Sequence, residues 1–396
     1  MTNSNKMIHV KEKIADFDAC SLYPSAMNRM EGYLKGLPKV LRETSYDFLR
    51  QQDGYFIRIK IIKLNKHLDF PLVSKISDKG VRTFTNDMEN EIIYIDKVGL
   101  EDLIEFQEAE FEVIDGYYYD NGRNNTINNV INDLYNLRLS LKKNKNPAEV
   151  VIKLSMNSMY GKTILKPIAT ETIIRDGRED FEKYVSYNYN YIDSVVEVND
   201  RYYIKRVKSV MEHFNYAPCG TEILSMSKRL MNEVFSCADD LGLKIYYQDT
   251  DSIHMNYDDV AKIAARFKIK YDRELVGKNM GQFHVDFAMD GACDDIYAIE
   301  SYFLSKKTYI DVLESKDVDG NTINQEHIRL KGIPTSCIKY KAELENKAVL
   351  DLYRELYNGR EINFDLTNEG TKINFKMNKD CSVSTVKKFK RTIKIH

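Results

Sequence analysis

Two aspartates separated by one residue occur within IYYQDTDSIH, at residues 245–254. The residues on either side alternate as in β-strands, so we expect Asp249, Thr250 and Asp251 at the tip of a hairpin. Carboxylates in such a place could hold a hard divalent cation such as Mg²⁺, which prefers oxygen ligands. The alternative is a solvated turn, and the short pattern fits both.

A third aspartate, Asp18, is expected at the end of a strand near the N-terminus, in DFDACSLYPS at residues 16–25. If the fold brings Asp18 to Asp249 and Asp251, the three carboxylates can converge on divalent cations. Two such ions can activate an attacking oxygen and hold a leaving oxygen in an in-line displacement at phosphorus. The candidate chemistry is therefore phosphoryl transfer with two Mg²⁺ ions, with Mn²⁺ as an alternative.

Phosphoryl transfer also needs fixed cations to absorb the charge of the phosphates, and two expected helices carry them. Apolar residues recur at helical spacing over residues 127–143, and a second helix is expected to end at Gly161. Between them, Asn146 suits the N-cap, Pro147 the first helical position and Glu149 the third, which predicts a capping box. The segment should form a short antiparallel helix pair.

Each helix of this pair gathers polar side chains on one face. Arg138 and Lys142 are four residues apart, and Lys153, Asn157 and Tyr160 follow the spacing of a second face. Two such faces could clamp a polyphosphate. The alternative is a solvated basic surface.

The bulk composition bounds the class of protein. The chain has 396 residues, 43% of them hydrophobic, and a formal net charge of −2, so it can form two or three lobes and any nucleic-acid surface must be local. Its six cysteines are far apart, which argues against a zinc site or a disulfide framework and indicates a reducing, cytoplasmic location. The sequence contains neither a bilayer-length apolar run nor a signal-peptide core.

The rest of the chain predicts an α+β fold. Residues 54–64 alternate as a strand, residues 91–119 predict strand, helix and strand, and residues 221–240 predict a helix. Residues 165–210 are strand-rich. Three tyrosines in this region alternate with asparagines, as on one face of a strand: Tyr187, Tyr189 and Tyr191. They would either pack within a hairpin or stack on unpaired bases.

Taken together, three stretches resemble motifs A, B and C of family B DNA polymerases, in the order of that family: DFDACSLYPS, KLSMNSMYG (153–161) and YQDTDS (247–252). A fourth, KKTY (306–309), resembles the K-x-Y motif that follows motif C in that family. The resemblance has motif support over about residues 10–335. It implies a right-hand polymerase with an antiparallel palm sheet, short two-helix fingers and a small thumb. The implied activity is template-directed addition of dNTPs to a primer 3′ end by two-metal phosphoryl transfer.

The resemblance also implies a role for each matched residue. Asp18 and Asp251 correspond to the metal ligands and Asp249 to an accessory carboxylate. Tyr23 corresponds to the tyrosine whose ring fills the space that a 2′-hydroxyl would need. The other implied nucleotide-binding residues are Ser21, Leu22, Arg138, Lys142, Lys153, Asn157 and Tyr160, with Tyr160 packed on Tyr23. The implied primer and DNA contacts are Lys307, Tyr309, Gly161 and Thr250. The alternatives are that Tyr23 and Tyr160 are core aromatics and that Lys307 is an exposed strand lysine.

Lys153 follows Arg138 by only 15 positions, and this short arm resembles the protein-primed branch of phages, adenoviruses and linear plasmids. Two stretches occupy the places of the terminal-protein-region insertions of that branch, and the second could close a ring round DNA and favour strand displacement. The expected domains are palm at 1–29, the first insertion, partly palm, at 30–126, fingers at 127–163, the second insertion at 164–208, palm at 209–330 and thumb at 331–396.

The partners implied by the resemblance are primer-template DNA and dNTPs, with a terminal protein as a further candidate primer. Because 17 residues precede Asp18, we expect no proofreading from this chain, and an exonuclease would be a separate subunit or a part that this chain lacks. The Lys-rich tail at 372–396 should touch phosphates, with a merely solvated tail as the alternative.

Three rival functions fit less well. A metal nuclease leaves Tyr23, Lys153 and the K-x-Y motif unexplained. A scaffold derived from a polymerase should have lost one of the aspartates. Synthesis of RNA is disfavoured by Tyr23.

Overall fold

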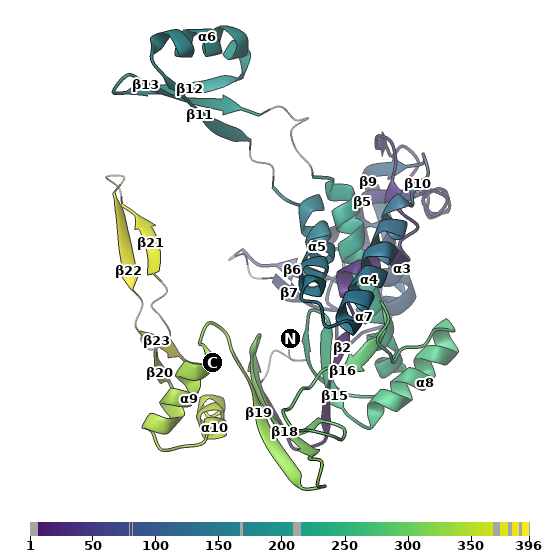
Figure 1. The fold of residues 1–396 in the computed structure, drawn as a ribbon. Coiled ribbons are helices and arrows are strands. Elements are labelled where there is room, and N and C mark those ends of the chain that lie inside the picture. Colours follow the sequence, from purple (N-terminus) through teal and green to yellow (C-terminus); the bar gives the residue numbers. More distant parts are fainter. Residues whose placement is uncertain are drawn as a thin grey trace.

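A computed structural model describes residues 7–78, 80, 82–166, 169–208, 215–366, 373–378, 382–387 and 390–395. Figure 1 shows a central sheet with helices packed on it, an upright pair of helices, α4 and α5, and three peripheral parts that extend from this centre. None of the helices in the described part of the chain is both long and apolar enough to cross a membrane.

The central sheet is antiparallel throughout and runs in the order β14–β15–β2–β17–β18–β19, with β1 added to β17 and β16 added to β2. Its strands are β1 (Ile8–Val10), β2 (Ile14–Ala19), β14 (Ile245–Asp249), β15 (Ser252–Asn256), β16 (Phe283–Val285), β17 (Tyr297–Ser305), β18 (Thr308–Lys316) and β19 (Thr322–Leu330). The apolar residues of β2 are buried, as expected for a strand inside a sheet that is covered by helices. The sheet therefore confirms the expected mixed α and β architecture.

The helices that pack on the part of the central sheet around β2 and β15 are α1 (Leu22–Arg29), α7 (Ala217–Asp240) and α8 (Asp259–Tyr271). Side chains from these helices and from β2 and β15 form one core, which contains Phe17, Met27, Val234 and Ile253. The predicted helix at 221–240 is confirmed and begins earlier, at Ala217.

The helix pair expected from the sequence consists of α4 (Thr126–Lys143) and α5 (Ala148–Thr163). The Oδ1 atom of Asn146 accepts a hydrogen bond from the Ala148 N–H at 2.9 Å, but the predicted capping box is wrong. The Glu149 carboxylate accepts instead from Arg138 Nε at 3.2 Å. The second helix also continues past Gly161, because this glycine keeps helical geometry and α5 ends at Thr163.

The first peripheral part follows α1 and contains the strand–helix–strand pattern predicted for residues 91–119. Its four-stranded sheet has the order β4–β9–β5–β8 and packs against α3. The elements of this part are β3 (Tyr33–Leu34), β4 (Lys39–Val40), α2 (Tyr46–Leu49), β5 (Gly54–Leu64), β6 (Ser74–Ile76), β7 (Arg82–Phe84), β8 (Ile92–Asp96), α3 (Lys97–Gln107), β9 (Ala109–Tyr119) and β10 (Arg123–Asn124). The strand predicted for residues 54–64 is confirmed as β5.

Buried ion pairs fix this first part to α7. Arg123 contacts both carboxylate oxygens of Glu222, at 3.0 and 2.7 Å, and Glu222 is 1% exposed. Arg229 of α7 likewise bonds Asp102 of α3 at 2.5 Å. Breaking an ion pair at this depth strongly destabilises a fold, so α7 and the first peripheral part should move together.

The second peripheral part leaves the centre after α5 and returns before α7. It is a three-stranded sheet in the order β11–β13–β12 with one helix: β11 (Thr170–Asp176), α6 (Arg178–Asn188), a 3₁₀ turn η1 (Tyr189–Tyr191), β12 (Ile192–Val198) and β13 (Arg201–Val207). Thr170 and Val207 are paired, and the Tyr216 N–H donates to the Thr163 carbonyl at 2.8 Å. The whole excursion therefore leaves and re-enters the molecule at one place.

The prediction that the three alternating tyrosines lie on a strand is wrong. Tyr187 lies near the end of α6, and Tyr189 and Tyr191 lie in η1, where their side chains are 82%, 76% and 50% exposed. They do not pack inside a hairpin. The face that does pack carries Phe181 on α6, which stacks on Tyr202 of β13 at 4.2 Å.

The C-terminal part contains α9 (Thr335–Leu344), α10 (Val349–Tyr357), β20 (Ile362–Asp365), β21 (Ile373–Met377), β22 (Val383–Lys387) and β23 (Lys390–Ile393). Apolar side chains of α9 and α10 share a core with β17–β19, which includes Tyr302 and Ile328. Seven of the 25 residues of the Lys-rich tail at 372–396 lie outside the described residues, and its expected contact with phosphates stays a prediction.

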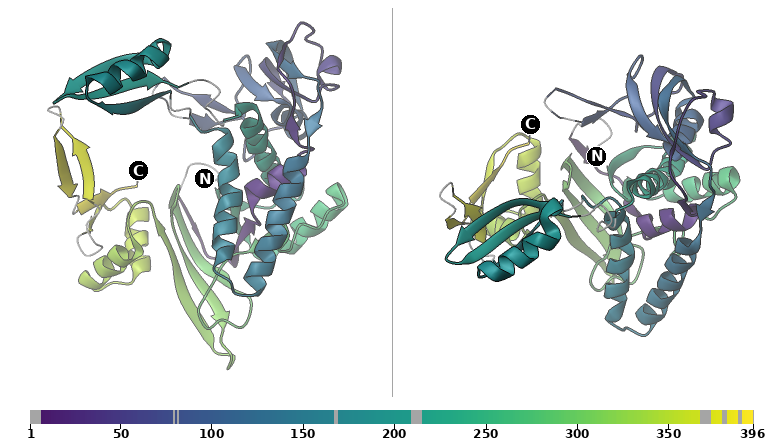
Figure 2. Two further views of the ribbon diagram at one scale, coloured as in Figure 1. Left: turned by 45° about the horizontal axis from the view of Figure 1, so that its top comes forward. Right: turned by 90° about the horizontal axis from the view of Figure 1, so that it is seen from above.

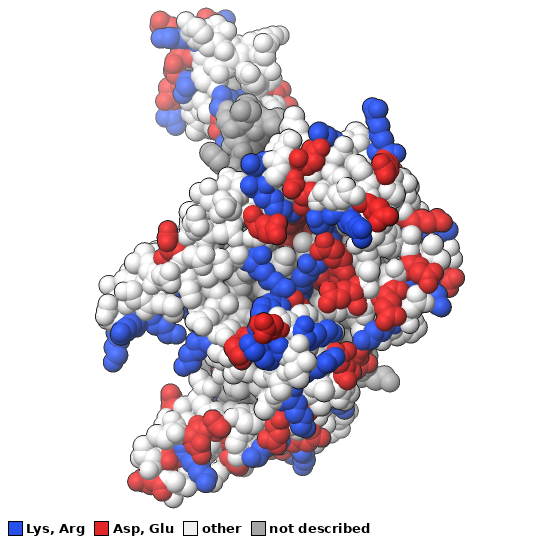
Figure 3. Space-filling model, turned by 90° about the vertical axis from the view of Figure 1, so that its right-hand side faces the viewer, with Lys and Arg blue, Asp and Glu red and all other residues white. Residues whose placement is uncertain are grey.

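Figure 2 shows the second peripheral part and the β21–β22 hairpin extending from the centre toward the same side of the molecule. The opposite side, seen in Figure 3, carries positive and negative side chains interspersed. Such a surface does not favour a polyanion over its whole area, in line with the small net charge.

Candidate active site

Two of the three candidate aspartates, which lie far apart in the sequence, meet at the ends of neighbouring strands. Asp18 on β2 is in register with Ser252 on β15, and the Ala19 N–H donates to the Asp251 carbonyl at 2.9 Å. Burial and the negative charge of Asp251 raise the pKa of Asp18 to about 8, and burial also raises the pKa of Asp251. The two carboxylates are therefore neighbours, as predicted.

Asp249 has a different environment, because its Oδ2 lies 3.3 Å from Lys307 Nζ. Among the described residues, no three His, Cys, Asp or Glu side chains are grouped as a metal site. Asp18 and Asp251 nonetheless fit Mg²⁺, which in phosphoryl-transfer sites is held by one or two carboxylates and completes its shell with water and substrate phosphates. Their mutual repulsion is a further sign of a place suited to a cation.

The main chain around these carboxylates is held in an uncommon conformation. Ser21, Thr250 and Lys307 have φ angles of 55°, 61° and 58°, in the left-handed region that non-glycine residues rarely enter. For the β-branched Thr250 this conformation is especially unfavourable. Strained residues of this kind concentrate at functional sites, where the surrounding structure imposes them.

Three cations from α4 and α5 face the turn between β2 and α1. Arg138 Nη1 donates to Ser21 Oγ at 3.2 Å. Burial raises the pKa of Cys20, and the positive charges of Arg138 and Lys142 oppose this rise. The charge of Lys153 likewise opposes the rise in the pKa of Asp18. The structure therefore brings all three predicted cations to the side of the aspartates.

The rings of Tyr23 on α1 and Tyr160 on α5 are stacked, with centroids 4.4 Å apart and an interplanar angle of 6°. The predicted contact between these two residues is confirmed. Both are half-buried, whereas Asn157 and Gly161 lie exposed on α5 and Leu22 is buried at the start of α1. The pair joins the helix pair to the turn that follows Asp18.

The two K-x-Y residues behave differently. Lys307 is exposed, and its N–H donates to the Tyr247 hydroxyl at 2.9 Å. Tyr309 is 7% exposed, and its ring lies 5.0 Å from that of Tyr247 in a buried cluster under the hairpin. The ring of Tyr309 is therefore largely covered by the protein's own aromatic side chains.

Sequence reasoning missed two residues beside Asp18. His284 on β16 is in register with Asp18 on the side away from β15, and its Nδ1 is 3.3 Å from Cys20 Sγ. His284 Nε2 lies 3.3 Å from Asp286, whose charge also raises the pKa of Asp18. The alternating pattern of FHVDF, at residues 283–287, was the only signal for this pair.

Several known proteins are similar to this chain. A DNA polymerase of Kluyveromyces lactis is 25% identical over 353 residues, which cover 87% of this chain and 32% of the relative. A DNA polymerase of Acidianus bottle-shaped virus is 28% identical over 172 residues, which cover 40% of this chain and 25% of the relative. The chain thus spans about a third or less of the length of these relatives.

The fold resembles that of Phi29 DNA polymerase, with a TM-score of 0.60 and 16% identity over 99% of this chain and 59% of that one. Its complex with primer-template DNA and incoming nucleotide substrates gives a TM-score of 0.58 at 18% identity. The sequence model for DNA polymerase type B, organellar and viral, matches residues 1–274 of the 396. The chain belongs to the organellar and viral type B DNA polymerases.

Proposed function

We propose that this chain is a template-directed DNA polymerase that adds dNTPs to the 3′ end of a primer. The observation that carries the proposal is the meeting of Asp18 and Asp251 opposite the cations of α4 and α5. Membership of the family supports it, as does the likeness of the fold to a polymerase complex with primer-template DNA and incoming nucleotides.

In this proposal Asp18 and Asp251 hold two Mg²⁺ ions. When bound, such ions activate the primer hydroxyl and neutralise charge on the phosphates. Asp249 pairs with Lys307, so its carboxylate keeps that ammonium beside the turn between β14 and β15, which we call the catalytic turn.

The chain's other residues position the nucleotide. Arg138, Lys142 and Lys153 bind the triphosphate, assisted by the main-chain amides at Ser21 and Leu22. The pocket for the base and sugar is shaped by Tyr23, Asn157 and Tyr160. Tyr160 supports the ring of Tyr23, and that ring excludes a 2′-hydroxyl. The proposed contacts to the primer and its duplex are Lys307, Tyr309, Gly161 and Thr250.

The parts of the fold then receive the names expected from the sequence. The central sheet with its helices is the palm, α4 and α5 are the fingers, and the C-terminal part is the thumb. The first and second peripheral parts correspond to terminal-protein regions 1 and 2. Protein priming and strand displacement are proposed on this correspondence.

The test is incorporation of one labelled dNTP on a primed template, with and without Mg²⁺. The proposal requires Mg²⁺-dependent extension that falls by about 10²–10³-fold or more in Asp251→Ala. Shortening of the labelled primer would favour a nuclease on the same carboxylates. Binding of DNA without either reaction would favour a non-catalytic scaffold.

A further inference from the structure

A cavity of 350 Å³ lies directly beside the catalytic turn, where the first peripheral part meets α7. Its walls come from five places in the chain: the start of α1, the segment 69–72, β7, α7 and the turn between β14 and β15. Tyr23 and Thr250 belong to the walls, so the cavity is continuous with the proposed nucleotide site.

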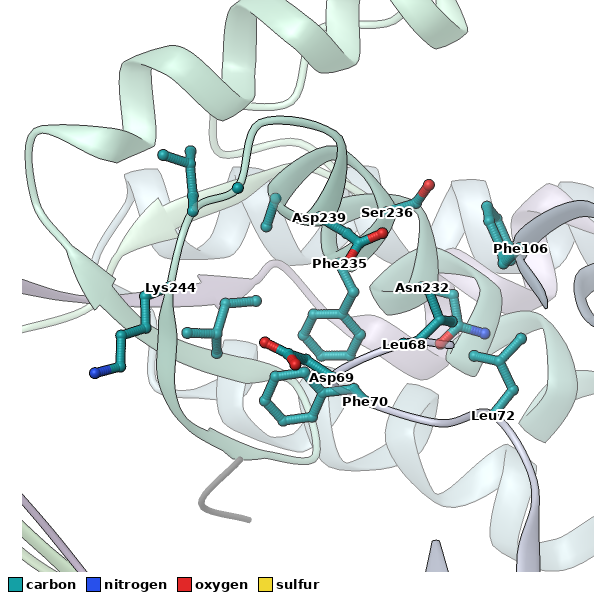
Figure 4. A pocket seen from close by; sticks show the side chains of 14 residues that line it. Leu68, Asp69, Phe70, Leu72, Phe106, Asn232, Phe235, Ser236, Asp239 and Lys244 are labelled. Carbon is teal, nitrogen blue, oxygen red and sulfur yellow. The ribbon is translucent and has the colours of Figure 1, made fainter. Parts of the chain in front are cut away.

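The walls are mainly apolar and rich in aromatic rings. Phe70 and Phe235 stack with centroids 4.9 Å apart and form one side, and Phe84 and Tyr23 contribute two more rings. Figure 4 shows Phe70 beside Phe235, seen from a neighbouring pocket of 340 Å³ whose lining also includes these two residues. The stacked pair is therefore a shared wall between an outer pocket and the cavity at the site.

A few polar groups are set among these rings. Gln248 and Asn232 bring side-chain amides, which can both donate and accept hydrogen bonds. Two cations, Arg82 and Lys228, outnumber the single acidic wall residue, Asp69. A flat ring with hydrogen-bonding edges and an attached phosphate matches aromatic walls, amides and an excess of positive charge.

We propose that this cavity accepts an unpaired nucleobase from a DNA strand held at the catalytic turn. The inference rests on the proposed polymerase function, because that function brings DNA strands to Thr250. Stacking on aromatic side chains tolerates all four bases, so the cavity should take any base that has left its pair. The base could come from the primer end or from the template, since both present the same chemistry.

Photocrosslinking with 5-iododeoxyuridine distinguishes these sources. One primer-template carries the iodinated base mismatched at the primer 3′ end, a second carries it paired there, and a third carries it unpaired in the template. Cross-linked peptides are identified by mass spectrometry. Extension of an unmodified matched primer is measured on the same protein, so that it reports separately on the proposed function.

The variant Phe84→Ala removes one aromatic wall, and Ile76→Ala is the matched control. Both residues lie exposed on the β6–β7 hairpin. Ile76 is not part of the walls of the 350 Å³ cavity and lines only a neighbouring groove between this hairpin, β5, β8 and α7. We expect cross-links to Phe70, Phe84 or Phe235 from an unpaired base and few from the paired base. Phe84→Ala should lower the yield at the remaining rings by about fivefold or more, the loss of one base–aromatic stack.

Cross-links from the primer probe assign the cavity to the primer strand, and those from the template probe assign it to the template. Cross-links confined to residues outside the walls would overturn the inference, even if the protein extends primers. Equal wall cross-linking by wild type, Phe84→Ala and Ile76→Ala would also overturn it.

Discussion

Asp18 and Asp251 repel each other when no cation lies between them. Because folding raises the pKa of Asp18 from its ordinary value of 3.8 to about 8, the folded state binds a proton that the unfolded state releases. Stability of the metal-free protein should therefore be lost as the pH climbs from 4 toward 8. A bound divalent cation should remove this loss.

The first prediction compares wild type with Asp18→Asn in EDTA. The amide cannot ionise, so the Tm of the variant should exceed that of wild type by an amount that grows between about pH 4 and pH 8. Mg²⁺ at pH 8 should raise the Tm of wild type more than that of the variant. Thermal melts check both points, and buried groups such as His254 titrate in both proteins and cancel in the difference. A Tm offset that is constant across this range would contradict the prediction.

The second prediction concerns the stacked tyrosines. Tyr23→Ala removes the ring that lies 4.4 Å from Tyr160, so discrimination against ribonucleotides should fall by about 10- to 100-fold, the range for a small steric difference in a pocket. Tyr23→Phe keeps the ring and should keep the discrimination. The ratio of kcat/KM for dNTP and rNTP measures the effect, and an unchanged ratio in Tyr23→Ala would remove the assigned role.

At the scale of elements, the helix pair acts as one arm that carries cations to the end of β2 in the central sheet. Its existence could be predicted because apolar residues recur at helical spacing and Asn146 and Pro147 mark a helix start. The capping box could not, because Glu149 has an alternative partner, Arg138, on the other helix. A local rule failed there because a tertiary ion pair competed with it.

The third prediction compares two lysines of α5. Lys153 faces Asp18, and Lys162 lies nine residues, or about two and a half turns, further on and so on the opposite face. Lys153→Ala should lower kcat/KM for a dNTP by about 10²-fold, because a cation that stabilises the reacting phosphates is lost. Lys162→Ala should lower it by less than about twofold, since exposed substitutions away from a site have small effects. Equal losses would indicate a general effect of charge.

The secondary structure around three tyrosines could not be predicted from their pattern alone. Alternation of Tyr187, Tyr189 and Tyr191 with asparagine has the period of a strand and the composition of one. The acidic residues at the start of α6, Glu179 and Asp180, favour a helix beginning after Gly177, and that helix continues into the tyrosines. Here the helix start outweighed the pattern that follows it.

At the scale of the whole molecule, the second peripheral part should matter for opening duplex DNA and not for the chemical step. The fourth prediction replaces residues 170–207 by a short linker, which the paired ends Thr170 and Val207 permit without stretching the chain. Extension on an open template should continue, whereas extension through a downstream duplex should be lost. Gel analysis of nicked and open templates separates the two activities.

A matched substitution refines this test. Tyr187→Ala with Tyr189→Ala alters only exposed side chains of the same part, and Tyr94→Ala removes an equally exposed tyrosine from the first part. Loss of displacement in the double variant alone would assign the activity to base stacking. Displacement that persists after removal of residues 170–207 would contradict the role of the whole part.

The molecular frame could be predicted from the sequence only in pieces. The motifs identified the two carboxylates, because their residue types and order are specific. His284 and Asp286 could not be found this way, because only the pairing of β16 with β2 brings them beside Asp18. The cavity at the site was equally hidden, since five separate segments build its walls.

The hydrogen bond between Tyr216 and Thr163 closes the base of the excursion that leaves after α5. A segment whose two ends lie side by side can be lengthened, shortened or replaced while the rest of the fold keeps its contacts, because lengthening a loop costs little free energy. Related chains could therefore differ greatly in the length of this segment, and a foreign domain could be inserted at the same position.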